Sequence, residues 1–369
     1  MKILVTGANG FIGKNLIAEL NNRGYKNIFE VTRDTTINEL VNYTREAQFV
    51  FHLAGINRPL LIEEYTNGNV GFTATLLNLL KEANNSCPVL FTSSIQAKLD
   101  NPYGISKKES EKELFFHAET LKSKVFIYRL PNVFGKWCRP NYNSAIATFC
   151  FNISNNLEIR VDDPSIELNL VYIDDVVQEF INALEGQPTI AEEYCEIHPV
   201  YKKTLGSIVD LIYSFKKSRE TLFIPNMEDE FIKILYSTYL SYLPKDNFSY
   251  PLKMNLDDRG SFTEFLKTTE RGQVSINISK PNITKGNHWH HTKNEKFLVV
   301  SGTGVIRLRK IDTNEIIEYF VSGERLEVID IPVGYTHNIE NLGETDMVTV
   351  MWVNEIYDPK RPDTNFLEV

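Results

Sequence analysis

The first half of the chain alternates short apolar runs, rich in β-branched and aromatic residues, with longer amphipathic segments. Strand-like runs that alternate with segments of helical periodicity predict a parallel sheet whose strands are connected by crossover helices. The predicted strands are residues 2–6, 28–32, 49–53, 89–93 and 125–130, and the clearest predicted helices are residues 12–22 and 107–121.

The pattern changes at about Leu252, after which strand-like stretches follow one another with turn residues between them. Such a pattern predicts an all-β domain, either a small sandwich or a closed barrel. The segment Leu-Pro-Lys-Asp-Asn-Phe-Ser-Tyr-Pro at 243–251 holds two prolines and several turn formers, so we expect domains over 1–243 and 252–369 with a linker over 244–251. The predicted strands of the second domain are residues 273–278, 296–300, 304–309, 316–321, 326–331 and 347–353.

The composition is that of a soluble globular protein. The 369 residues suffice for two domains, and no apolar run approaches the roughly 20 residues that span a bilayer. The first residues lead directly into a glycine pattern, and the cysteines form no CxxC pair, so we expect a cytoplasmic protein without membrane insertion. A net charge of -9, with no basic block, argues against nucleic acid as a partner.

A glycine pattern follows the first predicted strand, with Gly7, Gly10 and Gly13 at the start of a predicted helix. Glycines permit a tight turn and a close approach of the backbone to a pyrophosphate, whose charge is favoured by the N–H groups of the helix N-terminus. We therefore expect a dinucleotide site. The alternative is a glycine-rich turn with no ligand.

Arg33 lies just past the second predicted strand, where an acidic residue would accept the ribose hydroxyls of NAD. An arginine at this place can pair with a 2′-phosphate, which favours NADP over NAD. Glu30 and Asp34 stand close by and weaken this inference, and the alternative is a solvated surface arginine.

Tyr103 and Lys107 form a YxxxK arrangement. On one helix they lie one turn apart on the same face, where the lysine ammonium is expected to lower the pKa of the phenol and to hold the nicotinamide ribose. The tyrosine could then exchange a proton with a carbonyl or alcohol while a hydride moves to or from the cofactor. The alternative is surface packing of the two side chains.

The first domain resembles the extended short-chain dehydrogenases/reductases that act on nucleotide sugars. This resemblance implies a Rossmann-type, doubly wound α/β fold, Tyr103 as acid/base, Lys107 as its partner, and Ser94, or less favourably Ser93, as a hydrogen-bond donor to the reacting oxygen. Ser94 and Tyr103 are closer in sequence than in most relatives, which puts the serine in doubt. The motifs are TGANGFIG (6–13), HLAG (52–55), FTSS (91–94), YGISK (103–107), RLPNVFG (129–135) and VYIDDVV (171–177). The resemblance further implies cofactor contacts at Phe11, Ile12, Leu53 and Ala54, and a turn at Asn132 into the sugar-nucleotide pocket.

Histidines cluster in the second domain, in the run His288-Trp-His290-His291 and at His337. Alternate strand residues 288 and 290 point to one face, and Glu295 and His337 could converge from adjacent strands on a divalent metal. Imidazoles with one carboxylate suit zinc, iron, nickel or manganese. The alternative is a set of histidines that are packed in a barrel mouth and hydrogen-bonded without metal. His291 is a further possible ligand or base.

The second domain resembles the cupins, a family of double-stranded β-barrels. The spacings that carry this resemblance are His288-x-His290-x4-Glu295-x6-Gly302 and Pro332-x-Gly334-x2-His337-x3-Asn341. One departure is Asn282, which stands where cupins often have glycine.

The run Asp257-Asp258-Arg259-Gly260 and the residues after it are similar to the deoxysugar-nucleotide 3,5-epimerase branch of the cupins. That resemblance implies that Arg259 binds the phosphates of a nucleotide, that Glu264 and Lys285 bind substrate, and that His288 removes a proton beside a 4-ketone. Whether His288 is base or metal ligand stays open. The alternative for this run is a turn with a salt bridge.

Over essentially its whole length the chain resembles bifunctional enzymes of capsular polysaccharide synthesis. This implies C3 epimerisation of UDP-2-acetamido-2,6-dideoxy-β-L-arabino-hex-4-ulose in the cupin domain, followed by NADPH-dependent C4 reduction to UDP-N-acetyl-6-deoxy-L-talosamine, a step toward UDP-N-acetyl-L-fucosamine. The family also implies zinc and a homodimer. Two alternatives are a 4-keto-sugar reductase whose barrel serves only binding or dimerisation, and an iron-dependent cupin dioxygenase.

Overall fold

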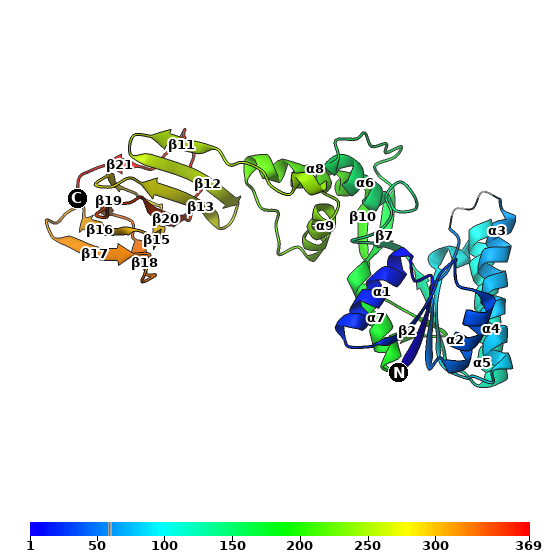
Figure 1. Ribbon diagram of the computed structural model, residues 1–369. Coiled ribbons are helices and arrows are strands. Elements are labelled where there is room, and N and C mark those ends of the chain that lie inside the picture. The colour runs from blue at the N-terminus through cyan, green and yellow to red at the C-terminus, as the bar shows by residue number, and fades with distance from the viewer. Residues whose placement is uncertain (58, 60) are drawn as a thin grey trace. The chain divides into compact units, whose positions relative to one another are not determined.

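The computed structural model describes residues 1–57, 59 and 61–369 (Figure 1). The chain folds into two compact units, which we call the N-terminal unit (Met1–Tyr213 with Ile234–Pro244) and the C-terminal unit (Ser214–Lys233 with Lys245–Val369).

The expected domain limits differ from these units in one segment, because Ser214–Lys233 belongs to the C-terminal unit. Backbone hydrogen bonds account for this placement. The N–H of Lys267 donates to the Leu222 carbonyl at 2.8 Å, and the N–H of Ile224 donates to the Lys267 carbonyl at 2.9 Å. Residues 222–224 are thereby joined to a strand of the C-terminal unit.

The N-terminal unit is built on a seven-stranded sheet with the order β2-β1-β3-β4-β5-β9-β8, in which the first six strands pair in parallel. Successive residues of a strand point to opposite faces, and Ile3 and Val5 enter one apolar core while Leu4 enters another. Helices α1 and α7 cover the first face, and α2, α4 and α5 cover the second (Figure 1). The strands are β1 (Lys2–Thr6), β2 (Asn27–Val31), β3 (Phe49–His52), β4 (Val89–Ser94), β5 (Val125–Leu130), β8 (Ile190–Ala191) and β9 (Tyr194–Cys195).

The helices of this unit follow the expected alternation. They are α1 (Phe11–Asn22), α2 (Ile37–Glu46), α3 (Glu63–Tyr65), the π-helical turn η1 (Thr66–Gly71), α4 (Phe72–Glu82), the 3₁₀ turn η2 (Ile95–Lys98), α5 (Pro102–Leu121), α6 (Ala145–Ser154) and α7 (Ile173–Leu184). A small second sheet has the order β10-β7-β6, with β6 (Asn132–Phe134), β7 (Glu167–Tyr172) and β10 (Tyr201–Thr204). Two helices cross the limit between the units, α8 (Leu205–Thr221) and α9 (Glu230–Leu240).

The C-terminal unit is all-β from Met254 onward, with antiparallel pairing throughout its two named sheets. Their orders are β11-β12-β13-β20-β15-β18 and β17-β16-β19-β14-β21. Phe297 and Val299 of the first sheet share one apolar core with Ile306 and Leu308 of the second. The elements are η3 (Lys245–Asn247), β11 (Met254–Asp257), β12 (Gly260–Thr268), β13 (Gly272–Ser279), β14 (Thr284–Trp289), β15 (Glu295–Ser301), β16 (Thr303–Lys310), β17 (Ile316–Ser322), β18 (Val328–Ile331), β19 (Tyr335–Asn341), β20 (Met347–Val353) and β21 (Asn365–Phe366).

Five strands of this unit, β11, β12, β14, β19 and β21, were not predicted. Two of them, β14 and β19, hold histidines of the expected cluster. Their sequences, TKGNHW and YTHNIEN, are mostly polar and lack the apolar alternation by which a half-buried strand is recognised. The polar character that hid these two strands comes in part from the functional candidates His288 and His337.

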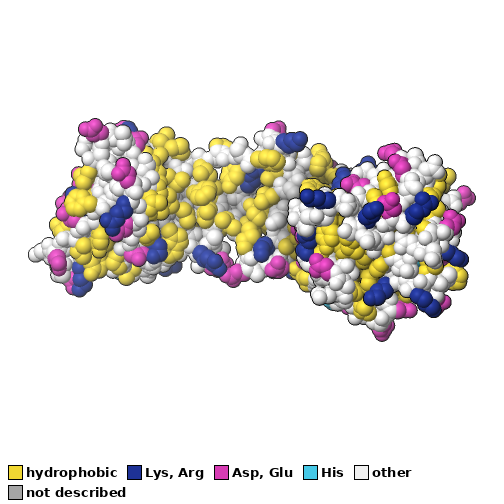
Figure 2. All heavy atoms as spheres, turned by 60° about the horizontal axis from the view of Figure 1, so that its bottom comes forward, with side chains coloured by type: hydrophobic (Ala, Val, Ile, Leu, Met, Phe, Trp, Pro, Cys, Tyr) yellow, Lys and Arg dark blue, Asp and Glu magenta, His cyan; other side chains and the backbone are white. Residues whose placement is uncertain are grey.

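Acidic and basic side chains are interspersed on the face of the protein in Figure 2, with apolar side chains between them. Among the helices of the described residues, none combines the length and apolar character needed to span a membrane. All four cysteines are unpaired.

Candidate functional site

The glycine loop joins the end of β1 to the start of α1. Gly7 has a φ of +69°, and a Cβ on Gly13 would lie 2.3 Å from the Gly7 carbonyl oxygen, so neither position accommodates a side chain without displacement. Gly10 caps α1 without any side-chain hydrogen bond. The first N–H groups of α1 are therefore suited to an anion such as a pyrophosphate.

A buried hydrogen-bond chain fixes the segment after β3. The Thr6 hydroxyl accepts from the N–H groups of Leu53 and Ala54, both at 3.1 Å, and lies 2.8 Å from His52 Nδ1. We infer that the hydroxyl donates to Nδ1, so that His52 Nε2–H donates to Thr73 at 2.8 Å. Burial lowers the pKa of His52 to about 3, which agrees with a neutral ring that supports the expected cofactor loop.

Tyr103 and Lys107 lie in the first turns of α5. The Asn101 side chain accepts from the Gly104 N–H at 2.8 Å, and Pro102 occupies the first helical position, so both residues favour a helix start directly before Tyr103. The Lys107 ammonium lies 6.0 Å from the centre of the Tyr103 ring and donates to the Thr92 carbonyl at 2.9 Å. The expected pair is therefore brought together at the carboxyl end of β4.

The pKa of Tyr103 is raised overall and not lowered as expected. Burial raises the pKa of Tyr103 to about 12, and a hydrogen bond with the Ser94 side chain only partly opposes this effect. Burial also lowers the pKa of Lys107 to about 8, while the Glu111 carboxylate acts in the opposite direction. Desolvation dominates because it penalises the charged form of each group.

Glu111 organises a polar network one helical turn beyond Lys107. Its carboxylate is buried, accepts two hydrogen bonds from Arg129 at 2.9 and 2.6 Å, and accepts another from the Ser93 hydroxyl. The Arg129 guanidinium also stacks on the Tyr194 ring, with 3.8 Å between the guanidinium carbon and the ring centre. Ser93 is thus engaged with Glu111, whereas Ser94 is the serine that contacts Tyr103.

A cavity of about 350 Å³ opens beside Tyr103, a volume within the usual range for small-molecule sites. Side-chain amides and two phenols dominate its lining, from Asn57, Tyr65, Gln96, Asn101, Tyr103 and Asn143. Such a lining offers hydrogen-bond donors and acceptors to a polyhydroxylated ligand.

Two other expected residues of this unit are exposed. Arg33 follows β2 and has no ion-pair partner among the described residues. Asn132 begins β6, and its side-chain amide donates to the Asn169 carbonyl at 3.2 Å.

The expected metal cluster of the C-terminal unit is assembled from both sheets. A bulge between Gly286 and His288 places His288 opposite His337 in the pairing of β14 with β19. Glu295 begins β15, which belongs to the other sheet, so it does not reach the histidines from an adjacent strand as expected. One ligand atom from each of His288, His290, Glu295 and His337 lies within 4.8 Å of the others.

The donor atoms of this cluster fit a divalent metal. Glu295 Oε2 lies 3.0 Å from His337 Nε2 and 3.6 Å from His290 Nε2, and all three atoms are buried without a hydrogen-bond partner in the described structure. Burial and the neighbouring His337 lower the pKa of His288 to about 4, so its ring is neutral and able to ligate or to accept a proton. Three imidazoles and a carboxylate match the donor preference of zinc.

The other expected residues of the C-terminal unit have different surroundings. His291 is exposed, lies outside the four-residue cluster and packs edge-on against Trp289. Arg259 is exposed and pairs with Asp257 at 2.7 Å across the turn between β11 and β12. Glu264 accepts from Lys267 at 2.9 Å. Lys285 donates to Asn277 Oδ1 at 2.9 Å and to the Ile278 and Ser261 carbonyls at 2.8 and 3.4 Å.

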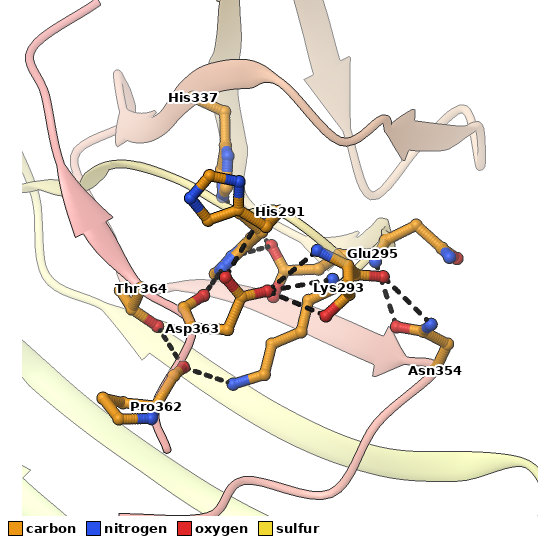
Figure 3. A network of polar contacts seen from close by, with 11 residues as sticks. His291, Lys293, Glu295, His337, Asn354, Pro362, Asp363 and Thr364 are labelled. Atoms are coloured by element: carbon orange, nitrogen blue, oxygen red, sulfur yellow. Dashed lines mark hydrogen bonds and ion pairs between the residues drawn. The ribbon is translucent and has the colours of Figure 1, made fainter.

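Two functional candidates escaped the sequence analysis. Glu111 follows Lys107 by four residues, and this helical spacing was a usable signal. Asp363 contacts the loop after His290 through the hydrogen bonds drawn in Figure 3. It lies some 70 residues farther along the chain, and no local pattern connects the two segments.

Comparison with known proteins agrees with this architecture. Residues 3–193 match the NAD dependent epimerase/dehydratase family. The chain belongs to this family. Residues 255–365 match the polysaccharide biosynthesis C-terminal domain. The Rossmann-type fold and the all-β second domain expected from the sequence are confirmed.

Two similar proteins cover the full length or nearly the full length of this chain. UDP-2-acetamido-2,6-beta-L-arabino-hexul-4-ose reductase of Pseudomonas aeruginosa is 44% identical over 99% of this chain and 98% of its own. The crystal structure of the capsular polysaccharide assembling protein CapF from Staphylococcus aureus is 59% identical, covers 100% of both chains and superposes with a TM-score of 0.96. The fold of the N-terminal unit is shared by UDP-glucuronic acid 4-epimerase of Bacillus cereus. That structure is 20% identical, has a TM-score of 0.52, and covers 58% of this chain and 83% of its own.

The Glu111→Gln substitution is predicted to lower the pKa of Lys107 below its value of about 8, because the carboxylate that favours the ammonium is lost while Arg129 remains nearby. NMR titration of ¹³C-lysine-labelled protein measures this value, with the signal assigned by its loss in Lys107→Met. Glu109→Gln is the matched control, because Glu109 pairs with Lys112 on the exposed side of the same helix. An unchanged Lys107 titration in Glu111→Gln would contradict the predicted coupling.

Proposed function

We propose that the chain is a bifunctional nucleotide-sugar enzyme that epimerises C3 and then reduces C4 of UDP-2-acetamido-2,6-dideoxy-β-L-arabino-hex-4-ulose to UDP-N-acetyl-6-deoxy-L-talosamine, for capsular polysaccharide. The observation that carries the reductase half is the grouping of Tyr103, Ser94 and Lys107 beside a polar cavity. The full-length relative named as a reductase of this sugar supports the substrate.

In the proposed reduction NADPH supplies the hydride, and Tyr103 supplies the proton. With a pKa of about 12, the phenol is protonated at neutral pH and able to donate to the C4 oxygen as negative charge develops there. Ser94 contributes a second hydrogen bond to the same oxygen. The Lys107 ammonium stabilises the phenolate that remains after proton transfer.

NADP(H) is proposed as the cofactor of the N-terminal unit. The glycine loop and the uncapped N-terminus of α1 suit the pyrophosphate, with Phe11, Ile12, Leu53 and Ala54 at the edge of the same loops. Arg33 supports the 2′-phosphate because its guanidinium is exposed and has no competing ion pair in the described structure.

The C-terminal unit is proposed to be a zinc-bearing cupin that catalyses the epimerisation. A 4-ketone acidifies the C3 hydrogen, because the carbanion becomes an enolate that a bound divalent metal would stabilise electrostatically. His290, Glu295 and His337 would hold the metal, with His288 as the fourth ligand or as the base. His288 is the less buried member of the histidine set, which favours its access to substrate. Arg259, Glu264, Lys285 and Asn132 remain proposed substrate contacts, and a cytoplasmic homodimer remains the proposed form of the protein.

Tyr103→Phe is expected to reduce NADPH oxidation by about 100-fold or more, because the proton donor to C4 is lost. Incorporation of solvent deuterium at C3 of the UDP-4-keto sugar should continue, since that step belongs to the other unit. Absorbance of NADPH and mass spectrometry of the sugar report the two steps. Tyr43→Phe is the matched control, because Tyr43 stacks on Phe29 away from the cavity. Undiminished reduction by Tyr103→Phe would remove this residue from the mechanism.

Arg33→Ala is expected to remove most of a preference for NADPH over NADH, since a charge-assisted pair with a phosphate contributes about 1.5–3 kcal/mol, or roughly 10- to 100-fold. Steady-state kcat/KM values with both cofactors give the ratio. Arg45→Ala, on the nearby helix α2, should leave the ratio at its wild-type value. Equal ratios in the wild type and Arg33→Ala would assign the 2′-phosphate to another residue.

His337→Ala is expected to lower bound zinc from about one equivalent per chain to a small fraction of that value and to abolish deuterium exchange at C3. It should also lower the melting temperature of the C-terminal unit, because a metal that binds only the folded state contributes its binding energy to folding. His291→Ala is the control and should retain zinc, because His291 lies outside the cluster. Elemental analysis gives the metal content, and a wild-type protein that exchanges C3 fully without metal would refute the zinc site. In that case His288→Asn, which removes the base, should stop exchange with little change in stability.

A further inference from the structure

The C-terminal tail, residues 362–369, crosses the C-terminal unit beside the histidine cluster. Its strand β21 pairs with β14, so that Phe366 lies opposite His288. The Leu367 N–H donates to the Asn287 carbonyl at 3.0 Å, and the Leu367 carbonyl accepts from the Thr336 hydroxyl. The tail is therefore joined by hydrogen bonds to the strands that carry His288 and His337.

Asp363 fixes the beginning of this tail against the loop that follows His290 (Figure 3). One carboxylate oxygen accepts from the His291 N–H at 3.0 Å. The other accepts from the N–H groups of Thr292 and Lys293 at 2.9 and 3.2 Å, and from the Thr292 hydroxyl at 3.1 Å. The Lys293 ammonium donates to the Pro362 carbonyl at 2.6 Å. Five hydrogen bonds thus join residues 362–363 to residues 291–293.

The main-chain carbonyl of Asp363 contacts the cluster itself. It lies within hydrogen-bond distance of His290 Nδ1, and because a carbonyl oxygen can only accept, Nδ1 must carry the proton. The unprotonated Nε2 then faces Glu295 Oε2 at 3.6 Å. Metal-ligating histidines usually donate their second ring N–H to such an oxygen, which sets both the tautomer and the ring orientation.

We propose that Asp363 is a positioning residue, whose side chain fixes the tail so that its carbonyl holds His290 with Nε2 directed at the metal. This inference rests on the proposed metal site and adds a residue that contacts no metal. Asp363 has a φ of +37°, in the left-handed region that favours glycine, asparagine and aspartate. The hydrogen bonds that the Asp363 carboxylate accepts from three main-chain N–H groups stabilise this conformation and so offset the backbone strain.

The test measures zinc affinity of the full-length protein by competition with a chromophoric chelator. Asp363→Ala should weaken zinc binding by about 10- to 100-fold, the usual effect of removing a partner that orients a ligand. Asp363→Asn should fall between Asp363→Ala and wild type, because its amide keeps one acceptor oxygen but cannot accept at the other. Asp358→Ala is the control, since the Asp358 carboxylate accepts from the Lys360 N–H in the segment just before the tail and has no contact with His290 in the described structure.

A second measurement separates positioning from loss of fold. In ¹⁵N-histidine-labelled protein without metal, NMR should find His290 as the Nδ1–H tautomer in wild type and in Asp358→Ala, and as a mixture of tautomers in Asp363→Ala. NADPH binding should be equal in all variants, because the N-terminal unit is unchanged. If Asp363→Ala fails to fold, Asp363→Asn provides both measurements.

The outcomes distinguish this inference from the proposed function. Zinc binding by wild type with equal affinity in Asp363→Ala, or an unchanged His290 tautomer, would overturn the role of Asp363 and leave the metal site in place. A wild-type protein that binds no zinc would overturn the metal site and this inference with it.

Discussion

The buried ammonium of Lys107 is the constraint on which the N-terminal site depends. Burial lowers its pKa to about 8, the Glu111 carboxylate acts in the opposite direction, and the ammonium donates to the Thr92 carbonyl. Glu111 is itself buried and requires Arg129. The Ser93 hydroxyl donates to the same carboxylate, and the adjacent Ser94 contacts Tyr103. The compensated charge of Lys107 is thus connected through Glu111 and Ser93 to the strand end that carries Ser94, next to Tyr103.

The C-terminal unit also has a charge that needs compensation, here the negative charge of Glu295. Glu295 is half-buried with its Oε2 atom out of contact with solvent, and His290 and His337 hold its pKa well below the ordinary value despite the opposing effect of burial. Several atoms of this cluster nevertheless lack hydrogen-bond partners in the described structure. Buried polar atoms without partners are costly, so a cation at their centre would stabilise the folded unit as well as supply chemistry. Loss of the proposed metal would therefore affect stability and activity together.

The sequence was most informative where apolar alternation and burial agree. The bounds of β1, β5 and β20 were predicted without error, since their residues face apolar cores. Helix α5 was predicted only from residue 107, although it begins at Pro102. The missed first turn, residues 102–106, holds Pro102, Gly104 and the buried Ser106 and so offers no apolar periodicity.

In the candidate sites, contacts between segments far apart in the sequence could not be predicted either. Spacing brought together the four members of the metal cluster, but it could not reveal that Glu295 reaches it from the opposite sheet. Asp363 gave no signal, because its partners are main-chain N–H groups, which every residue but proline possesses. Interactions with the main chain depend on the fold rather than on the partner's residue type, and a single sequence does not display them.

The two proposed activities are ordered by chemistry rather than by their order along the chain. Removal of the C3 proton requires the 4-ketone, because only the ketone delocalises the carbanion as an enolate. Reduction at C4 consumes that ketone and makes the C3 hydrogen unreactive. The proposed reductase therefore ends the reversible exchange and fixes one C3 configuration, so the selectivity of the Tyr103 site for one epimer decides the product. Under the proposed function, a metal site that exchanged both epimers freely would suffice for the first step, and stereochemical control would fall to the cavity beside Tyr103.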